Sequence, residues 1–275
     1  MAAKKNPATK TALAKATTGT SLANIDAELS NEVANIKNQI GQSSSNKLTL
    51  EPTGDFVLPD GGNLGNEIQI VIVDFASQNK FYDQAYNRDN PAPPACYAIG
   101  KPASQGGNLA DMAPEPDSPD IQNETCGPCP LNQFKSAAGG GNGKACQNRR
   151  VAAVLVVDPE NPDAHNAPDA PIYILDLSPT NIKPFDGAIS MATKSLGHYI
   201  KVIFTMTGKN VGTYATVTIS DPVPNPDYAI HAGRRAQCED ALTRKPDFAG
   251  YAAKAPPARS RAGAAAPRRA AGARR

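Results

Sequence analysis

The segment from Cys96 to Cys146 places the strongest constraint on how this chain can fold. It is rich in glycine and proline and has almost no apolar periodicity. A segment of this kind buries too little apolar surface to fold by itself, so it is either disordered or held by another interaction. Four cysteines lie in it, and the middle two form a CxxC pair.

These four cysteines predict one structural metal site. A CxxC turn lets two thiolates approach the same ion, and its backbone amides can hydrogen-bond the sulfurs. Two further cysteines would complete a tetrahedron, and zinc bound in this way contributes folding free energy on the order of 10 kcal/mol. The expected zinc ligands are Cys96, Cys126, Cys129 and Cys146.

Three other interpretations of the cysteines stay open. The same four ligands could hold an iron–sulfur cluster. The CGPC tetrapeptide at 126–129 is also the redox motif of thioredoxins, although Pro130 follows it directly and the chain has no tryptophan. The cysteines could also be reduced thiols with no partner. Five cysteines, with Cys238 expected as a free thiol, and no secretory signal favour a reducing compartment.

Both ends of the chain are basic. Residues 1–20 carry four lysines and residues 254–275 carry seven lysines and arginines, in both cases without an acid. The whole chain has a net charge of only +2, so the central region is acidic. We expect a disordered basic arm at 1–20 and a disordered Arg/Ala/Pro-rich tail at 233–275. Such segments either bind polyanions or keep the protein soluble.

An amphipathic helix is predicted over residues 21–41. Six apolar residues from Leu22 to Ile40 are spaced 3, 4, 4, 3 and 4 apart, which draws one stripe along a helix. Ser21 suits the N-cap and Gly41 the C-terminal end. The stripe can pack on the protein's own core or against a second copy of the chain.

The remaining pattern predicts a mainly β protein of the α+β class. Strands are expected at 47–51, 55–58, 67–75, 151–158, 172–177 and 214–220, and a helix at 186–200. Too few helices alternate with these strands for a βαβ fold. We therefore expect a small antiparallel or mixed OB-like sheet over 47–232, with the four-cysteine insertion at about 91–150.

Several segments resemble a family of uncharacterised bacteriophage proteins. They are EIQIVIVDF (67–75), NPAPPACYAIG (90–100), DMAPEPDSPD (111–120), ETCGPCPLNQF (124–134), GNGKACQNRR (141–150) and TKSLGHYIKVIFTMTG (193–208). Members of this family resemble phage single-stranded DNA-binding proteins in which a zinc-ribbon-like insert interrupts an OB-like sheet. The resemblance carries over only the four cysteines, as metal ligands. Phe134-Lys135-Ser136 departs from it, because family members more often have an aromatic-Gly-Ser step there.

Aromatic and basic residues around the cysteines are candidates for contact with nucleic acid. Aromatic rings stack on exposed bases, while lysine and arginine hold phosphates. The candidate residues are Tyr82, Tyr86, Tyr97, Phe134, Lys135, Lys144, Arg149 and Arg150. Packing of the tyrosines on the loop, and a solvated strand entry at 149–150, are the competing interpretations.

The function expected from these patterns is sequence-independent binding of single-stranded DNA, or of another nucleic acid, during phage DNA replication. The alternative is a structural or assembly protein of the virion or nucleoid, with the zinc site as a brace and the N-terminal helix forming a homo-oligomer. No enzyme motif such as GxxxxGK[ST], HExxH or GxSxG is present. No apolar run is long enough to span a membrane, and the expected location is the cytoplasm of an infected bacterial host.

Overall fold

The computed structural model describes residues 46–85, 87, 92–106, 112–138 and 141–248. These residues belong to one compact unit of the chain. The predicted basic arm at 1–20, the predicted helix at 21–41, Tyr86 and residues 249–275 lie outside them.

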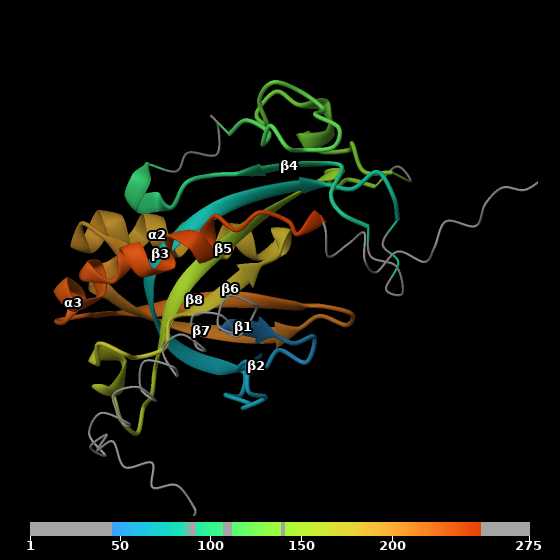
Figure 1. The fold of residues 1–275 in the computed structure, drawn as a ribbon. Coiled ribbons are helices and arrows are strands. Elements are labelled where there is room, and N and C mark those ends of the chain that lie inside the picture. Colours follow the sequence, from blue (N-terminus) through green and yellow to red (C-terminus); the bar gives the residue numbers. More distant parts are fainter. Residues whose placement is uncertain (1–45, 86, 88–91, 107–111, 139–140, 249–275) are drawn as a thin grey trace, which may run out of the picture. The chain divides into compact units, whose positions relative to one another are not determined.

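The described residues contain one curled, mixed β-sheet (Figure 1). The strand order is β2-β1-β6-β5-β3-β7-β8, and β4 also pairs with β3. Strands β1 and β6 run parallel, and every other pair in the sheet is antiparallel. The strands are β1 (Lys47–Leu50), β2 (Phe56–Val57), β3 (Glu67–Phe81), β4 (Cys96–Ile99), β5 (Cys146–Val157), β6 (Tyr173–Leu177), β7 (Val202–Asn210) and β8 (Ala215–Pro224).

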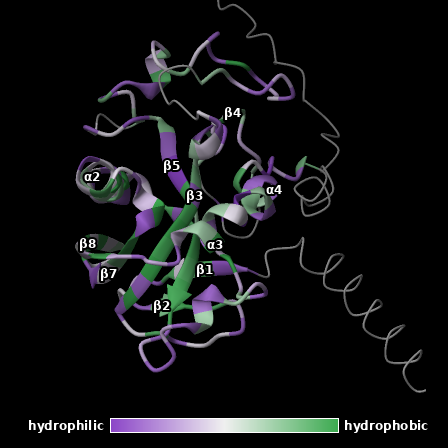
Figure 2. Ribbon diagram, turned by 90° about the vertical axis from the view of Figure 1, so that its left-hand side faces the viewer, coloured by the Kyte–Doolittle hydropathy of each residue, from purple (hydrophilic) through white to green (hydrophobic). Residues whose placement is uncertain are grey.

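Strands β3 and β5 form the centre of the sheet and are longer than predicted. Their apolar halves are buried on both faces, which explains the continuous runs of valine and isoleucine. The expected strand at 67–75 continues to Phe81, although residues 77–80 are polar. This extension is stable because its backbone groups pair with β4 on one side and β5 on the other. Figure 2 shows the change from apolar to hydrophilic residues along these strands.

The curl of the sheet brings the β1–β2 turn against β7. Gly54 lies in this turn and faces Gly208 of β7 so closely that a Cβ on Gly208 would be 2.1 Å from the Gly54 carbonyl oxygen. The Asn210 side-chain amide donates a hydrogen bond to the Pro52 carbonyl at 2.6 Å. The prediction of a mainly β fold with a mixed sheet is confirmed. The path of strands nevertheless has two ends, β2 and β8, so the OB-like description stays a prediction.

One long helix, α2 (Pro179–Leu196), packs on the sheet. Its buried face includes Phe185, Ala188 and Ala192, and Phe185 meets Phe75 of β3 edge to face. The helix ends at Gly197, whose φ of 81° is the left-handed conformation that glycine adopts readily. The predicted helix at 186–200 therefore exists but begins and ends earlier along the chain.

The start of the expected C-terminal tail is folded, which corrects the prediction for residues 233–248. Short helices α3 (Tyr228–Gly233) and α4 (Glu239–Leu242) flank a 3₁₀ turn at Arg235–Cys238. Cys238 and Leu242 are buried in the main core, although too few apolar residues surround them in sequence to form a recognisable period. Three further 3₁₀ turns important below are Pro130–Asn132, Ala164–Asn166 and Tyr199–Lys201.

None of the helices in the described residues combines the length and apolar character needed to cross a membrane.

Candidate metal site and the loop above it

Two of the four cysteines are placed by the sheet itself. Cys96 begins β4 and Cys146 begins β5, and both are opposite Phe81 of β3 in the strand register. Residues directly opposite each other on paired strands project from the same face of a sheet. Cys96 and Cys146 therefore lie on one face, on either side of Phe81.

The CxxC pair is placed over this face by a loop that is closed on itself. The Cys126 backbone N–H donates to the Met112 carbonyl at 2.7 Å. The Asn132 side-chain amide donates to the Cys126 carbonyl at 2.8 Å, and the Asn132 backbone N–H donates to the Cys129 carbonyl at 3.0 Å. Gln133 donates to the Gly127 carbonyl at 2.8 Å. These amide contacts stabilise a turn whose apolar packing is limited to a small cluster of Ala98, Met112 and Cys126.

All four cysteines line a single pocket, which we call the cysteine pocket. Polar groups lie around its sulfurs: the Gln122 backbone and the Ser118 side chain act to lower the pKa of Cys96, and the Asn79 side chain acts to lower that of Cys126. Donors of this kind stabilise negative charge on sulfur and commonly surround metal-bound thiolates.

Without a cation the pocket favours protonated thiols. Burial, and then repulsion from the neighbouring thiolates, raises the pKa of Cys146 to about 12. The pKa values of Cys96 and Cys126 are raised for the same main reason, the burial of the thiol. Cys126, Cys129 and Cys96 all contribute to the raised pKa of Cys146, as expected of thiols that line one pocket.

The fit of the pocket to a metal ion is incomplete in this arrangement. In residues 46–248, apart from the gaps stated above, no three Cys, His, Asp or Glu side chains form a group that could hold a metal ion. The donor set is nevertheless one that zinc prefers, and Asn79 keeps a buried Oδ1 without a partner in the described structure.

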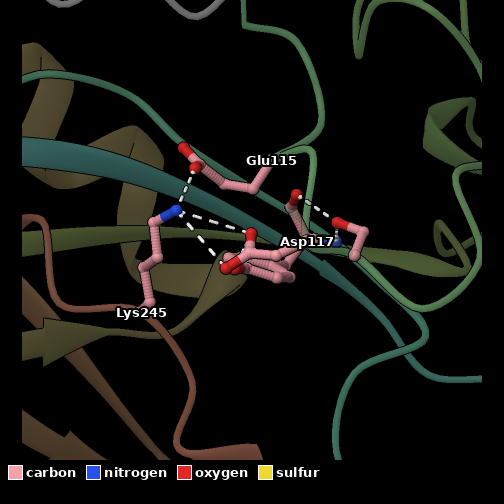
Figure 3. A network of polar contacts seen from close by, with 5 residues as sticks. Glu115, Asp117 and Lys245 are labelled. Carbon is pink, nitrogen blue, oxygen red and sulfur yellow. Dashed lines mark hydrogen bonds and ion pairs between the residues drawn. The ribbon is translucent and has the colours of Figure 1, made fainter.

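Backbone hydrogen bonds attach the loop that leads to the cysteine pocket to β4 and to the residue before it. The Glu115 backbone N–H donates to the Tyr97 carbonyl, and the Asp120 backbone N–H donates to the Ala95 carbonyl, both at 2.8 Å. Figure 3 shows how Lys245 joins this loop to the C-terminal segment. Its Nζ lies 2.8 Å from a carboxylate oxygen of Glu115 and 3.4 Å from one of Asp117.

Beyond the pocket the loop presents an exposed aromatic ring, and we call Phe134, Lys135 and Lys144 the loop tip. Phe134 is 77% exposed, the largest exposed fraction among the large apolar side chains in the described part of the chain. Lys144 Nζ lies 5.1 Å from the centre of its ring. Lys135 has a φ of 72°, a left-handed conformation that glycine adopts more readily.

The other candidate residues for nucleic-acid contact are less available. Tyr97 is buried and its hydroxyl donates to Asp117 at 2.5 Å. Arg150 is buried and forms a two-pronged ion pair with Asp186 of α2. Neither side chain is therefore at the surface: Tyr97 packs against Phe248 on the face that it shares with Lys80, and Arg150 is covered by α2 on the opposite face.

Arg149 and Tyr82 remain at least partly accessible. Arg149 is half-buried and its Nη1 lies 3.0 Å from Asp176. Tyr82 is half-buried at the end of β3.

The structure also pairs two histidines that are far apart in sequence. The rings of His165 and His231 lie 5.2 Å apart, and both side chains are buried. His231 contacts Asn225 and Asn166 at 3.0 Å, whereas neither ring nitrogen of His165 has a partner in the described structure. Burial and the neighbouring histidine lower the pKa of His231 to about 4. No local motif marks this pair.

No protein-family model, curated protein or solved structure matches the chain significantly.

Proposed function

We propose that this protein binds single-stranded nucleic acid, largely independently of sequence, through the loop tip above the cysteine pocket. The observation that carries the proposal is Phe134, which exposes most of an aromatic ring on a loop that hydrogen bonds hold in one shape. A single exposed apolar side chain is common on protein surfaces, so the weight of the proposal falls on the combination of this ring with the cations of the loop tip.

The chemistry of the loop tip fits an unpaired base better than an apolar protein surface. A base can stack on the Phe134 ring, because every base has a π-face and stacking contributes about 1–3 kcal/mol per base. Lys144 Nζ lies over one face of the ring, which leaves the other face for a base, and Lys135 follows Phe134 in sequence, so two cations can meet the flanking phosphates. A duplex keeps its bases stacked on each other and offers the ring no such surface, which favours single strands.

In this proposal the cysteine pocket holds one structural zinc ion. Cys96, Cys126, Cys129 and Cys146 would bind it, and the ion would supply charge neutralisation for their thiolates and a crosslink between β4, β5 and the loop. The shared pocket and the hydrogen-bond donors around the sulfurs support this role. An iron–sulfur cluster would use the same ligands. The curled sheet then acts as an OB-like support, and the reducing cytoplasm of an infected bacterial cell keeps the thiols available.

The test is an anisotropy titration of the full-length protein with fluorescent oligo-dT of about 16 nucleotides, near the upper site size of an OB fold. We expect Phe134→Ala to weaken binding about ten-fold or more, through the loss of one stacked base. The matched control is Tyr228→Ala, because Tyr228 is 40% exposed and has Lys201 Nζ 5.1 Å from its ring centre. The control should bind like the wild type.

Two results would remove the proposal. One is no binding of oligo-dT by the wild-type protein at about 50 mM salt, where electrostatic attraction is strong. The other is equal affinity of wild-type, Phe134→Ala and Tyr228→Ala proteins.

A further inference from the structure

A group of basic side chains lies on the face of the sheet opposite the cysteine pocket. Lys80 is next to Phe81 in β3 and so projects from the other face, and Arg149 of β5 shares that face with it. Asp176 of β6 lies on the same face, as does Lys47 of β1, which is opposite Ile174 of β6. We call Lys47, Lys80 and Arg149 the basic face.

The two acids on this face, Asp74 and Asp176, do not balance its three cations, and Asp74 accepts hydrogen bonds from Ser104 and Tyr199 instead. Asp176 is ion-paired with Arg149 at 3.0 Å. In the part of the chain that the structure describes, neither Lys47 nor Lys80 has a carboxylate within salt-bridge distance.

The two lysines are also close enough to affect each other. Burial lowers the pKa of Lys80, and positive charge on Arg149 and Lys47 lowers it further, against the opposing effect of Asp176. Excess positive charge is therefore concentrated here, on a protein whose central region is acidic.

We propose that the basic face holds the phosphate backbone of a nucleic-acid single strand, and that this strand is the one whose base stacks on Phe134. This inference rests on the proposed function and adds a second contact surface to it. A flexible strand can reach both surfaces by passing over the ends of β3 and β5, where Lys80 and Phe81 project to opposite sides. A stiff duplex cannot follow such a path.

The experiment measures the salt dependence of oligo-dT binding for a Lys47→Gln/Lys80→Gln double variant of the full-length chain. Each phosphate contact on a single strand contributes about 0.7 to the slope of log affinity against log salt concentration. Loss of two contacts should therefore reduce the slope by about 1.4. The matched control is Lys183→Gln/Lys194→Gln, which removes the same charge from exposed positions of α2. Its slope should stay at the wild-type value.

The outcomes separate this inference from the proposed function. If the wild type binds and Phe134→Ala weakens binding, but the two double variants have equal slopes, the basic face is not a contact surface. A lower slope in the Lys47→Gln/Lys80→Gln protein alone supports it. Circular dichroism and urea unfolding of both double variants show whether a change in slope comes from a folded protein.

Discussion

Gly208→Ala tests the curl of the sheet, because it places one methyl group where β7 meets the β1–β2 turn. The new Cβ would lie 2.1 Å from the Gly54 carbonyl oxygen and 2.9 Å from Leu50 Cδ1. Two of the three nearest atoms belong to the Gly54 backbone, so a side-chain rotation cannot relieve the overlap. The turn and β7 must separate by about 1 Å to restore ordinary contact.

The expected cost is about 3 kcal/mol of unfolding free energy. Forced overpacking of a close contact costs about 1–3 kcal/mol. Separation of the two segments also strains the Asn210–Pro52 hydrogen bond, which contributes about 1 kcal/mol. Urea unfolding followed by circular dichroism measures the change, and an unchanged dependence on urea shows that the folded state stays compact.

Gly187→Ala is the matched control for this substitution. Gly187 lies inside α2, and a Cβ there would meet no atom within 4 Å. Alanine should stabilise the protein by about 0.5–1 kcal/mol because it is a better helix former than glycine. A Gly208→Ala protein as stable as the wild type would refute the close approach of the turn to β7.

Three further substitutions test other contacts. The pKa of His231 is about 4 in the folded protein and about 6.5 in the unfolded chain, so between these pH values only the unfolded state binds the extra proton. The unfolding free energy should therefore fall by up to about 3 kcal/mol as the pH drops from 6.5 to 4. His231→Gln should reduce this loss, which urea unfolding at several pH values measures. Asp186→Ala leaves the buried Arg150 guanidinium unpaired and should cost about 3 kcal/mol, whereas adding Arg150→Met should recover part of the loss in a double-mutant cycle. Lys135→Gly relieves a left-handed backbone conformation and should not lower stability; a clear loss would show that the lysine side chain supports the loop.

The apolar strands could be predicted from sequence because burial leaves a local pattern. Continuous valine and isoleucine in β3 and β5 mark strands covered on both faces. The polar half of β3 and the short β4 carry no such pattern. They are strands because their backbones pair with segments distant in the chain, and such pairing cannot be deduced from composition.

The candidate site was only partly predictable for the same reason. The cysteine spacing predicted a shared site, and the structure brings all four cysteines to one pocket. Which neighbouring side chains reach the surface depends on strand register, which turns Arg150 inward and leaves Arg149 half-exposed. Prediction of the basic face would also require the strand register, because Lys47 and Lys80 come from strands that are not neighbours in the chain or in the sheet.

Metal analysis of the purified protein tests the central claim most directly: that four cysteines hold one ion and so fix the loop that carries Phe134. Protein prepared under reducing conditions without chelator should contain about one zinc per chain, as expected of a four-thiolate site. Cys126→Ser/Cys129→Ser should lose the metal, and Cys238→Ser, at a buried cysteine outside the pocket, should keep it. Iron in the protein, together with visible absorption, would show that the same four ligands hold an iron–sulfur cluster instead of zinc. Protein that contains no metal and takes up none from added zinc would contradict the claim.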